Sequence, residues 1–258
     1  MVAASAGGIK RRAHQIVCGA AAAALASSDV IARTRVKICG VRRPEDALAA
    51  ARAGADAIGL VFDPSAPRRI TLDDARAILA VLPAFVTPVA LFVNSDLAAL
   101  RRTIDALRLR HVQLNGNEPA EYVAELRDLA VIKAVRVEAA TFGRTLSAWR
   151  AAAAARGLTN LKGLVLETAG TSQPGGTGVP NDWATVRHHQ AAGDFDGLPP
   201  VIAAGGLTPD TVAAVVRDLR PWAVDVSSGV EESRGIKSPD RIAAFIGAVR
   251  RVDATATA

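Results

Sequence analysis

Short apolar runs alternate with longer amphipathic segments along most of the chain, beginning near Arg35. The runs are rich in valine, isoleucine and leucine, and each covers only a few residues, as is typical of buried β-strands. They centre on Val36, Ile58, Val89, Val112, Ile132, Val165, Ile202 and Val224. Strands that alternate with helices pair in parallel through right-handed crossovers, so the pattern predicts an α/β fold.

The segments between the runs carry signals for helix starts. In "LTPDTVAAVVRDL", Thr208 is placed to cap a helix that begins at Pro209, and the apolar residues that follow recur at helical spacing. Ser238 and Pro239 repeat this arrangement in the last amphipathic segment. Thr71 precedes two acidic residues, which a helix dipole favours in the first turn. Each segment is therefore expected to be a helix.

The number of strand–helix units predicts a single (β/α)8 TIM barrel, a fold of roughly 250 residues. The alternative is an open sheet with a dinucleotide site, which would need a G-x-G-x-x-G turn after the first strand. The sequence there, "KICGVRRPED", lacks that turn. We therefore expect the barrel over residues 34–258 and a flexible N-terminal extension over residues 1–33.

Composition and charge limit the classes of partner. The formal net charge is +6, but the basic residues are dispersed along the predicted helices, and aromatic residues make up only 4% of the chain. A nucleic-acid-binding surface would concentrate its charge and add aromatic side chains for stacking, so we expect no nucleic-acid partner. The dispersed charge leaves anionic small molecules as candidate substrates.

The cysteines and the apolar runs bear on location. Cys18 and Cys39 form neither a disulfide framework nor a C-x-x-C pair, which favours the reducing cytoplasm. The N-terminal segment has a basic start and an alanine-rich middle, but its apolar run is shorter than that of a typical signal peptide. No apolar run approaches the length of a membrane span, so we expect no membrane partner.

Polar residues of one parity mark the inner face of the predicted barrel. Side chains alternate along a strand, so Val36 and Ile38 would face the helices while Lys37 and Cys39 point inward. The same parity turns inward three polar residues near the ends of other strands: Asn115, Glu167 and Asp225. Gln113 would lie one layer deeper. Barrel active sites lie at the carboxyl ends of the strands, so we expect a site there, although a single inward polar residue could be a hydrogen-bonded core group.

Glycine- and serine-rich turns follow the last two strands. Backbone N–H groups in such turns approach an anion closely, and (β/α)8 barrels commonly bind phosphate there. The candidate residues are Gly205, Gly206, Ser227, Ser228 and Gly229. The glycine-rich loop after the sixth strand could be a plain connection or a lid over a sugar phosphate. The histidines have no metal-ligand spacing, so no metal is expected.

Several motifs resemble those of phosphoribosylanthranilate isomerase, over about Arg35 to Val249. The specific ones are "KICG", "HVQL" and "DVSSGVE" in this order, accompanied by "GADAIGLVF", "SAPRRI", "GGTG" before "DW", and "AAGGLTPDTV". The resemblance implies an Amadori rearrangement of N-(5-phosphoribosyl)anthranilate to 1-(2-carboxyphenylamino)-1-deoxyribulose 5-phosphate in tryptophan biosynthesis. It implies no metal or organic cofactor. A monomer and a homodimer both remain open.

The resemblance also implies roles for individual residues. Cys39, in "KICG", would be the general base that removes the proton from sugar C2, and Glu167 would be the general acid that protonates the ring oxygen. Arg68, in "SAPRRI", would bind the anthranilate carboxylate through its planar guanidinium. Backbone groups around Gly176 and the two turns named above would hold the phosphate. Asp225 could orient the substrate or anchor its strand end.

The sequence departs from the family pattern within this site. Glu167 is one methylene longer than the family's aspartate, and Asn115 replaces the second histidine of "HVQLHG" at a substrate-binding position. Val179 and Asn181 stand where the family has a lysine and a phenylalanine. These changes keep two alternatives open: a diverged isomerase or epimerase of another sugar phosphate, and a non-catalytic barrel that binds a phosphate ligand.

Overall fold

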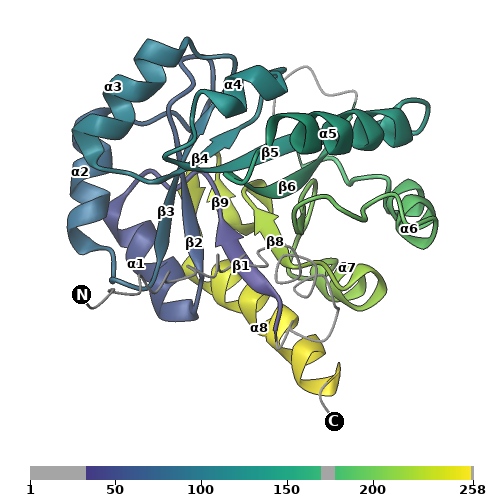
Figure 1. Cartoon of the computed structure of the whole chain (residues 1–258). Coiled ribbons are helices and arrows are strands. Elements are labelled where there is room, and N and C mark those ends of the chain that lie inside the picture. The colour runs from purple at the N-terminus through teal and green to yellow at the C-terminus, as the bar shows by residue number, and fades with distance from the viewer. Residues whose placement is uncertain (1–32, 170–177, 257–258) are drawn as a thin grey trace, which may run out of the picture. The chain divides into compact units, whose positions relative to one another are not determined.

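Eight parallel strands close into a barrel in the computed structural model, which describes residues 33–169 and 178–256 (Figure 1). Each strand pairs with the next along the chain, and β8 pairs with β1 to close the barrel. The strands are β1 (Arg35–Ile38), β2 (Ala57–Val61), β3 (Thr87–Phe92), β4 (His111–Leu114), β5 (Ala130–Val137), β6 (Leu161–Thr168), β7 (Val201–Ala203) and β8 (Ala223–Val226). Every expected strand centre lies within one of them, so the predicted (β/α)8 barrel is confirmed.

Helices connect the strands and surround the barrel (Figure 1). They are α1 (Pro44–Ala53), α2 (Leu72–Val81), α3 (Leu97–Leu107), α4 (Ala120–Ala124), α5 (Phe142–Arg156), α6 (Trp183–Ala191), α7 (Val212–Leu219) and α8 (Pro239–Ala256). After β8, a 3-10 turn η2 (Ser228–Val230) leads into a small hairpin of β9 (Glu231–Ser233) and β10 (Ile236–Lys237). No helix in the described ranges is long and apolar enough to cross a membrane.

Two of the predicted helix starts are confirmed by their hydrogen bonds. At α2, Thr71 Oγ1 accepts from the backbone N–H of Asp74 at 3.1 Å, and Asp74 Oδ2 accepts from the N–H of Thr71 at 2.9 Å. At α8, Ser238 Oγ accepts from the N–H of Arg241 at 3.3 Å. These side chains satisfy N–H groups that the first turn of a helix leaves unpaired.

The predicted start of α7 at Pro209 is wrong. The helix begins at Val212, and a turn precedes it. Thr208 and Thr211 bond to each other across this turn: each hydroxyl accepts from the other residue's backbone N–H, at 3.3 and 3.0 Å. Thr208 therefore stabilises the turn before the helix, because threonine hydroxyls can close a local turn as well as cap a helix.

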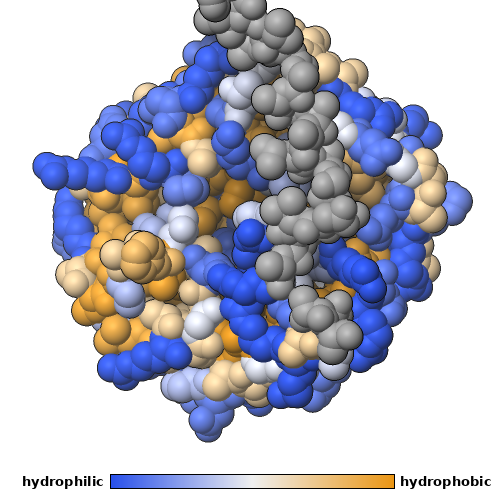
Figure 2. Space-filling model, turned by 60° about the horizontal axis from the view of Figure 1, so that its bottom comes forward, coloured by the Kyte–Doolittle hydropathy of each residue, from blue (hydrophilic) through white to orange (hydrophobic). Residues whose placement is uncertain are grey.

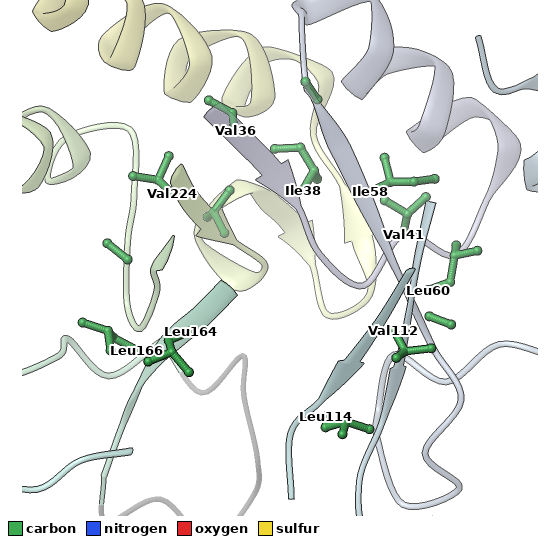
Figure 3. Packing of buried hydrophobic residues seen from close by; sticks show 14 of the residues in the cluster. Val36, Ile38, Val41, Ile58, Leu60, Val112, Leu114, Leu164, Leu166 and Val224 are labelled. Atoms are coloured by element: carbon green, nitrogen blue, oxygen red, sulfur yellow. The ribbon is translucent and has the colours of Figure 1, made fainter. Parts of the chain in front are cut away.

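The hydrophobic core lies between the outer face of the barrel and the helices. Figure 3 shows part of it, with fully buried side chains from five strands: Val36, Ile38, Ile58, Leu60, Val112, Leu114, Leu164, Leu166 and Val224. On the face shown in Figure 2, hydrophilic residues predominate along the outer edge, and hydrophobic residues reach the surface in patches between them. Because side chains alternate along a strand, the residues between those of the core point into the barrel.

The predicted extension, residues 1–33, falls almost entirely outside the described residues. Its last residue, Arg33, is described, and its Nη1 donates to Asp56 Oδ2 at 2.9 Å. The same carboxylate oxygen accepts from the backbone N–H of Val36 at 2.8 Å. Arg33 is thus tied to the start of the barrel, and the boundary after it stays a prediction.

Candidate active site

A cavity at the carboxyl ends of the strands gathers most of the side chains that the sequence singled out. Its lining includes Cys39, Arg68, Asn115, Glu167, Gly205, Gly206, Asp225, Ser227 and Ser228. Gly229 follows in η2 and is not among the lining residues, and Gly176 lies outside the described residues. The inward-pointing side chains at the ends of four strands therefore bring a thiol, an amide and two carboxyl groups into the lining of this cavity.

Cys39 follows β1 and lies against a buried ion pair. Its backbone N–H donates to the carbonyl of Val226 at 2.8 Å, which fixes the residue at the end of the strand. Below it, Lys37 Nζ donates to Asp225 Oδ2 at 2.8 Å, and both side chains are only 5% exposed. Burial acts to lower the pKa of Lys37, but the charges of Asp225 and Cys39 prevail and raise it. Lys37 is therefore a cation.

Burial is the strongest influence on the Cys39 thiol, and it raises the pKa of that group above its ordinary value. The charge of Lys37 and its hydrogen bond to the thiol act in the opposite direction without cancelling the effect of burial. An unperturbed cysteine thiol has a pKa of about 8.5. In the structure the thiolate is a smaller fraction and a correspondingly stronger base.

Asp225 is bonded through one oxygen only. Oδ2 accepts from Lys37, whereas Oδ1 is buried without a hydrogen-bond partner in the described part of the chain. A buried acceptor without a donor is costly, and this residue lines the cavity. Asp225 can thus anchor Lys37 and accept a hydrogen bond from a ligand at the same time.

Glu167, near the carboxyl end of β6, is held by Asn115. Asn115 Nδ2 donates to Glu167 Oε1 at 3.2 Å, so two of the residues expected to depart from the family pattern contact each other. Burial first, and then the charge of Asp225, raise the pKa of the Glu167 carboxyl despite the hydrogen bond from Asn115. Glu167 therefore keeps its proton to a higher pH than an exposed glutamate, as a proton donor requires.

Arg68 is buried in a bidentate ion pair that the sequence reading missed. Its Nε and Nη2 donate to the two carboxylate oxygens of Glu231 at 2.7 and 2.8 Å. Lys237 Nζ donates to Glu231 Oε1 at 2.9 Å. Burial acts to raise the pKa of Glu231, but its bonds to Arg68 and Lys237 hold that pKa below the ordinary value. Glu231 is the last residue of the motif "DVSSGVE", which is the sequence feature that could have identified it as a residue of the site.

The turns after β7 and β8 lie on another wall of the cavity. Gly205 and Gly206 both have positive φ, 95° and 62°, a backbone conformation that glycine adopts without strain. Lys237 Nζ donates to the carbonyl of Ser227 at 3.0 Å, so a buried cation lies against the second turn. Asn181 donates to the carbonyls of Leu166 and Ala204 at 3.0 and 3.1 Å and connects the ends of β6 and β7.

An apolar wall, also missed by the sequence reading, completes the cavity beside Arg68. Cys39 packs there with Val61 and Leu91, and Ala66 and Val93 lie at its edge. These side chains come from strand ends and loops of the first three strands. A flat apolar group could lie against this wall with an anionic substituent directed at Arg68.

A second cavity adjoins the first, and Asn115 and Glu167 line both. Lys133 lines the second cavity, but its charge is paired with buried Glu118, whose Oε2 lies 2.9 Å from Lys133 Nζ. Among residues 33–169 and 178–256, no group of three or more histidine, cysteine or acidic side chains is arranged to hold a metal ion. Because it lines both cavities, Glu167 lies where they meet.

Comparisons with known proteins agree on one family. A family model described as "N-(5'phosphoribosyl)anthranilate (PRA) isomerase" matches residues 36–248. A protein of Pseudomonas syringae pv. tomato named N-(5'-phosphoribosyl)anthranilate isomerase is 48% identical over 215 residues, which cover 83% of this chain and 97% of that protein.

Solved structures are similar to the barrel at lower identity. The phosphoribosyl anthranilate isomerase of Thermotoga maritima superposes with a TM-score of 0.73 at 35% identity, over 84% of this chain and 99% of that one. Another solved structure is a phosphoribosyl anthranilate isomerase in complex with reduced 1-(o-carboxyphenylamino)-1-deoxyribulose 5-phosphate. It has a TM-score of 0.70 at 34% identity, over 84% of this chain and 99% of that one.

The contact between Lys37 and Cys39 yields a first prediction. In a Cys18→Ser background, where Cys39 is the one remaining thiol, Lys37→Gln removes the cation that favours the thiolate. The pKa of Cys39 should therefore rise further. The pH dependence of thiolate ultraviolet absorbance measures it. The control is Lys162→Gln, which replaces an exposed lysine on β6 and should leave the titration unchanged. An unshifted titration in Lys37→Gln would refute the coupling between Lys37 and Cys39.

Proposed function

The chain belongs to the N-(5'-phosphoribosyl)anthranilate isomerase family, and on that premise we propose that it isomerises this substrate with Cys39 as general base and Glu167 as general acid. The protein is an isomerase of tryptophan biosynthesis. The observation that carries the assignment of roles is the cavity lining, which contains both a thiol and a carboxyl group whose pKa is raised by burial. Both groups have the proton chemistry that the reaction needs.

The cavity suggests how the substrate would lie. Its phosphate would bind at the turns after β7 and β8, where backbone N–H groups and Lys237 supply positive potential. Its aromatic ring would lie on the apolar wall, and its carboxylate would meet Arg68 where that side chain lines the cavity. Glu231 supports this contact because it holds the guanidinium in place. The ribose would then lie between Cys39 and Glu167.

Ring opening would come first. Glu167 donates its proton to the ring oxygen while the bond between that oxygen and sugar C1 breaks. The lone pair of the anthranilate nitrogen forms the C=N bond of an iminium ion, so no free cation develops on carbon. Glu167 is left as a carboxylate, and Asn115, which donates to Oε1, stabilises that charge.

Proton abstraction would follow. The Cys39 thiolate takes the proton from sugar C2, the electrons of the C–H bond form a C1=C2 double bond, and the C=N electrons return to nitrogen. The resulting enolamine becomes the ketone when the C2 hydroxyl loses its proton and C1 gains one. Cys39 then carries one proton more, and Glu167 one fewer, than at the start. One proton passed between them or exchanged with solvent restores the enzyme.

We also propose that the protein works in the cytoplasm. Cys39 is a free cysteine in the structure, and its proposed role requires the thiol to stay reduced. A reducing compartment protects such a group from oxidation and mixed disulfides.

Removal of either proton-transfer group should abolish most of the activity. Cys39→Ala and Glu167→Gln should each lower kcat by about two to four orders of magnitude, the usual contribution of general acid–base catalysis. The decay of substrate fluorescence, with the substrate generated enzymically in the same cuvette, measures the rate. Cys18→Ser is the control and should behave like the wild type. A folded Cys39→Ala protein with near-normal kcat would contradict the assignment of the base.

Close packing around the thiol offers a subtler test. Gly59 on β2 faces Cys39, and a Cβ added there would lie 2.7 Å from Cys39 Sγ and 3.1 Å from Lys37 Nζ. Gly59→Ala should displace the thiol and lower kcat by about tenfold or more, because small displacements of reacting groups are costly. Gly163→Ala on β6 is the matched control, since its Cβ would meet the Ile202 methyl at 3.1 Å. Equal kcat in both variants would contradict the proposed role of the Cys39 thiol.

A further inference from the structure

Two amide side chains form a hydrogen-bonded chain that leads from the barrel interior to the carboxyl of Glu167. Gln113 Nε2 donates to Asn115 Oδ1 at 2.6 Å, and Asn115 Nδ2 donates to Glu167 Oε1 at 3.2 Å. Gln113 is fully buried on β4, and Asn115, just past the end of that strand, is 6% exposed. The backbone N–H of Asn115 donates to the carbonyl of Phe92 at 2.8 Å, which fixes the position from which its side chain reaches.

The polarity of this chain follows from the two unlike ends of an amide. Gln113 presents an N–H donor to Asn115, so the Asn115 oxygen faces Gln113 and its NH2 group faces Glu167. An oxygen of Glu167 that receives an N–H must act as an acceptor. When Glu167 is protonated, its proton therefore belongs on Oε2, the oxygen that Asn115 does not contact.

Without the N–H donor of Gln113, no hydrogen bond between these two amides would prevent the Asn115 side-chain amide from rotating by half a turn. Its oxygen would then face Glu167 and accept the carboxyl proton in a hydrogen bond. That arrangement would hold the proton against Asn115 and away from a substrate. The acid would still be present, but its proton would be directed at the wrong partner.

We propose that Gln113 is a positioning residue that acts through Asn115 to keep the Glu167 proton on Oε2, where the substrate can receive it. The inference rests on the proposed role of Glu167 as general acid. Gln113 touches neither the substrate nor Glu167 in this scheme. Its contribution is the orientation of one amide, and the protein gains a proton donor whose direction is set before the substrate binds.

Substitution of Gln113 or Asn115 leaves the charged groups around Glu167 unchanged. Glu167 interacts electrostatically with four charged groups: Asp225 on β8, Lys37 on β1, and Lys133 and Arg136 on β5. Neither Gln113 nor Asn115 carries a charge. Substitution of either amide therefore isolates the hydrogen bond that lowers the pKa of Glu167.

The test compares Gln113→Leu and Asn115→Leu with a matched control, Asn160→Leu. Asn160 is also a buried amide with an unpartnered oxygen, but it donates to the carbonyls of Val123 and Leu126 and not to the site. Gln113→Leu should lower kcat by about tenfold with KM within about twofold, because the acid is misdirected while binding groups are intact. The limb of the kcat/KM pH profile that reports Glu167 should move to higher pH in both site variants.

Asn160→Leu should lose thermal stability without a shift of that limb. If Gln113→Leu behaves like Asn160→Leu, Gln113 has only a structural role and the proposal is overturned. Gln113→Met, which keeps an unbranched side chain of similar length, replaces Gln113→Leu should that variant not fold. The same outcomes apply to it.

An infrared measurement gives a readout that needs no turnover. The C=O stretch of the protonated Glu167 carboxyl, identified by its absence in Glu167→Gln, should shift in Gln113→Leu, because Oε1 loses its N–H donor and the carboxyl O–H gains the Asn115 oxygen as an acceptor. An unmoved band overturns the proposal. Two kinds of failure can be told apart. If Glu167 is not the general acid, Glu167→Gln retains normal kcat. If only the positioning role is wrong, Glu167→Gln is inactive and Gln113→Leu has normal kcat.

Discussion

The buried ion pair between Lys37 and Asp225 is the interaction on which the rest of the site depends. The two residues are direct partners in the β1–β8 pairing that closes the barrel. A charge inside a barrel is costly unless it is paired, so removal of either residue leaves the other as a destabilising unpaired group. The same pair sets the local electrostatics, since Lys37 favours the Cys39 thiolate and Asp225 favours the protonated form of Glu167. Barrel closure and proton chemistry thus share one contact.

A second group of buried charges fixes the rim of the barrel. Glu231 binds Arg68 and Lys237, and it thereby connects the loop after β2 to the hairpin after β8. Lys133 and Glu118 form a comparable buried pair between β5 and the segment after β4. Loops that carry binding groups are otherwise the least restrained parts of such a fold. These ion pairs hold the binding groups in place before a substrate arrives, which reduces the cost of organising the site.

The residues expected to depart from the family pattern make hydrogen bonds that their separate positions in the sequence do not suggest. Asn115 donates to Glu167, so the two residues act as hydrogen-bond partners. Asn181 bridges two strand ends through two backbone carbonyls. Val179 is 48% exposed, and the buried Lys237 Nζ donates to the carbonyl of Ser227 in the turn after β8.

The sequence by itself determined the strands, the parity that turns Lys37 and Gln113 inward, and the capped starts of two helices, because these depend on the periodicity and chemistry of neighbouring residues. The helix start assigned to Thr208 failed because a hydroxyl can close a turn as readily as it caps a helix. Only the tertiary structure decided that Arg68 pairs with Glu231 and that burial outweighs Lys37 at Cys39. Those outcomes depend on distances between residues far apart in the chain, and on how completely the barrel excludes water, which no local pattern encodes.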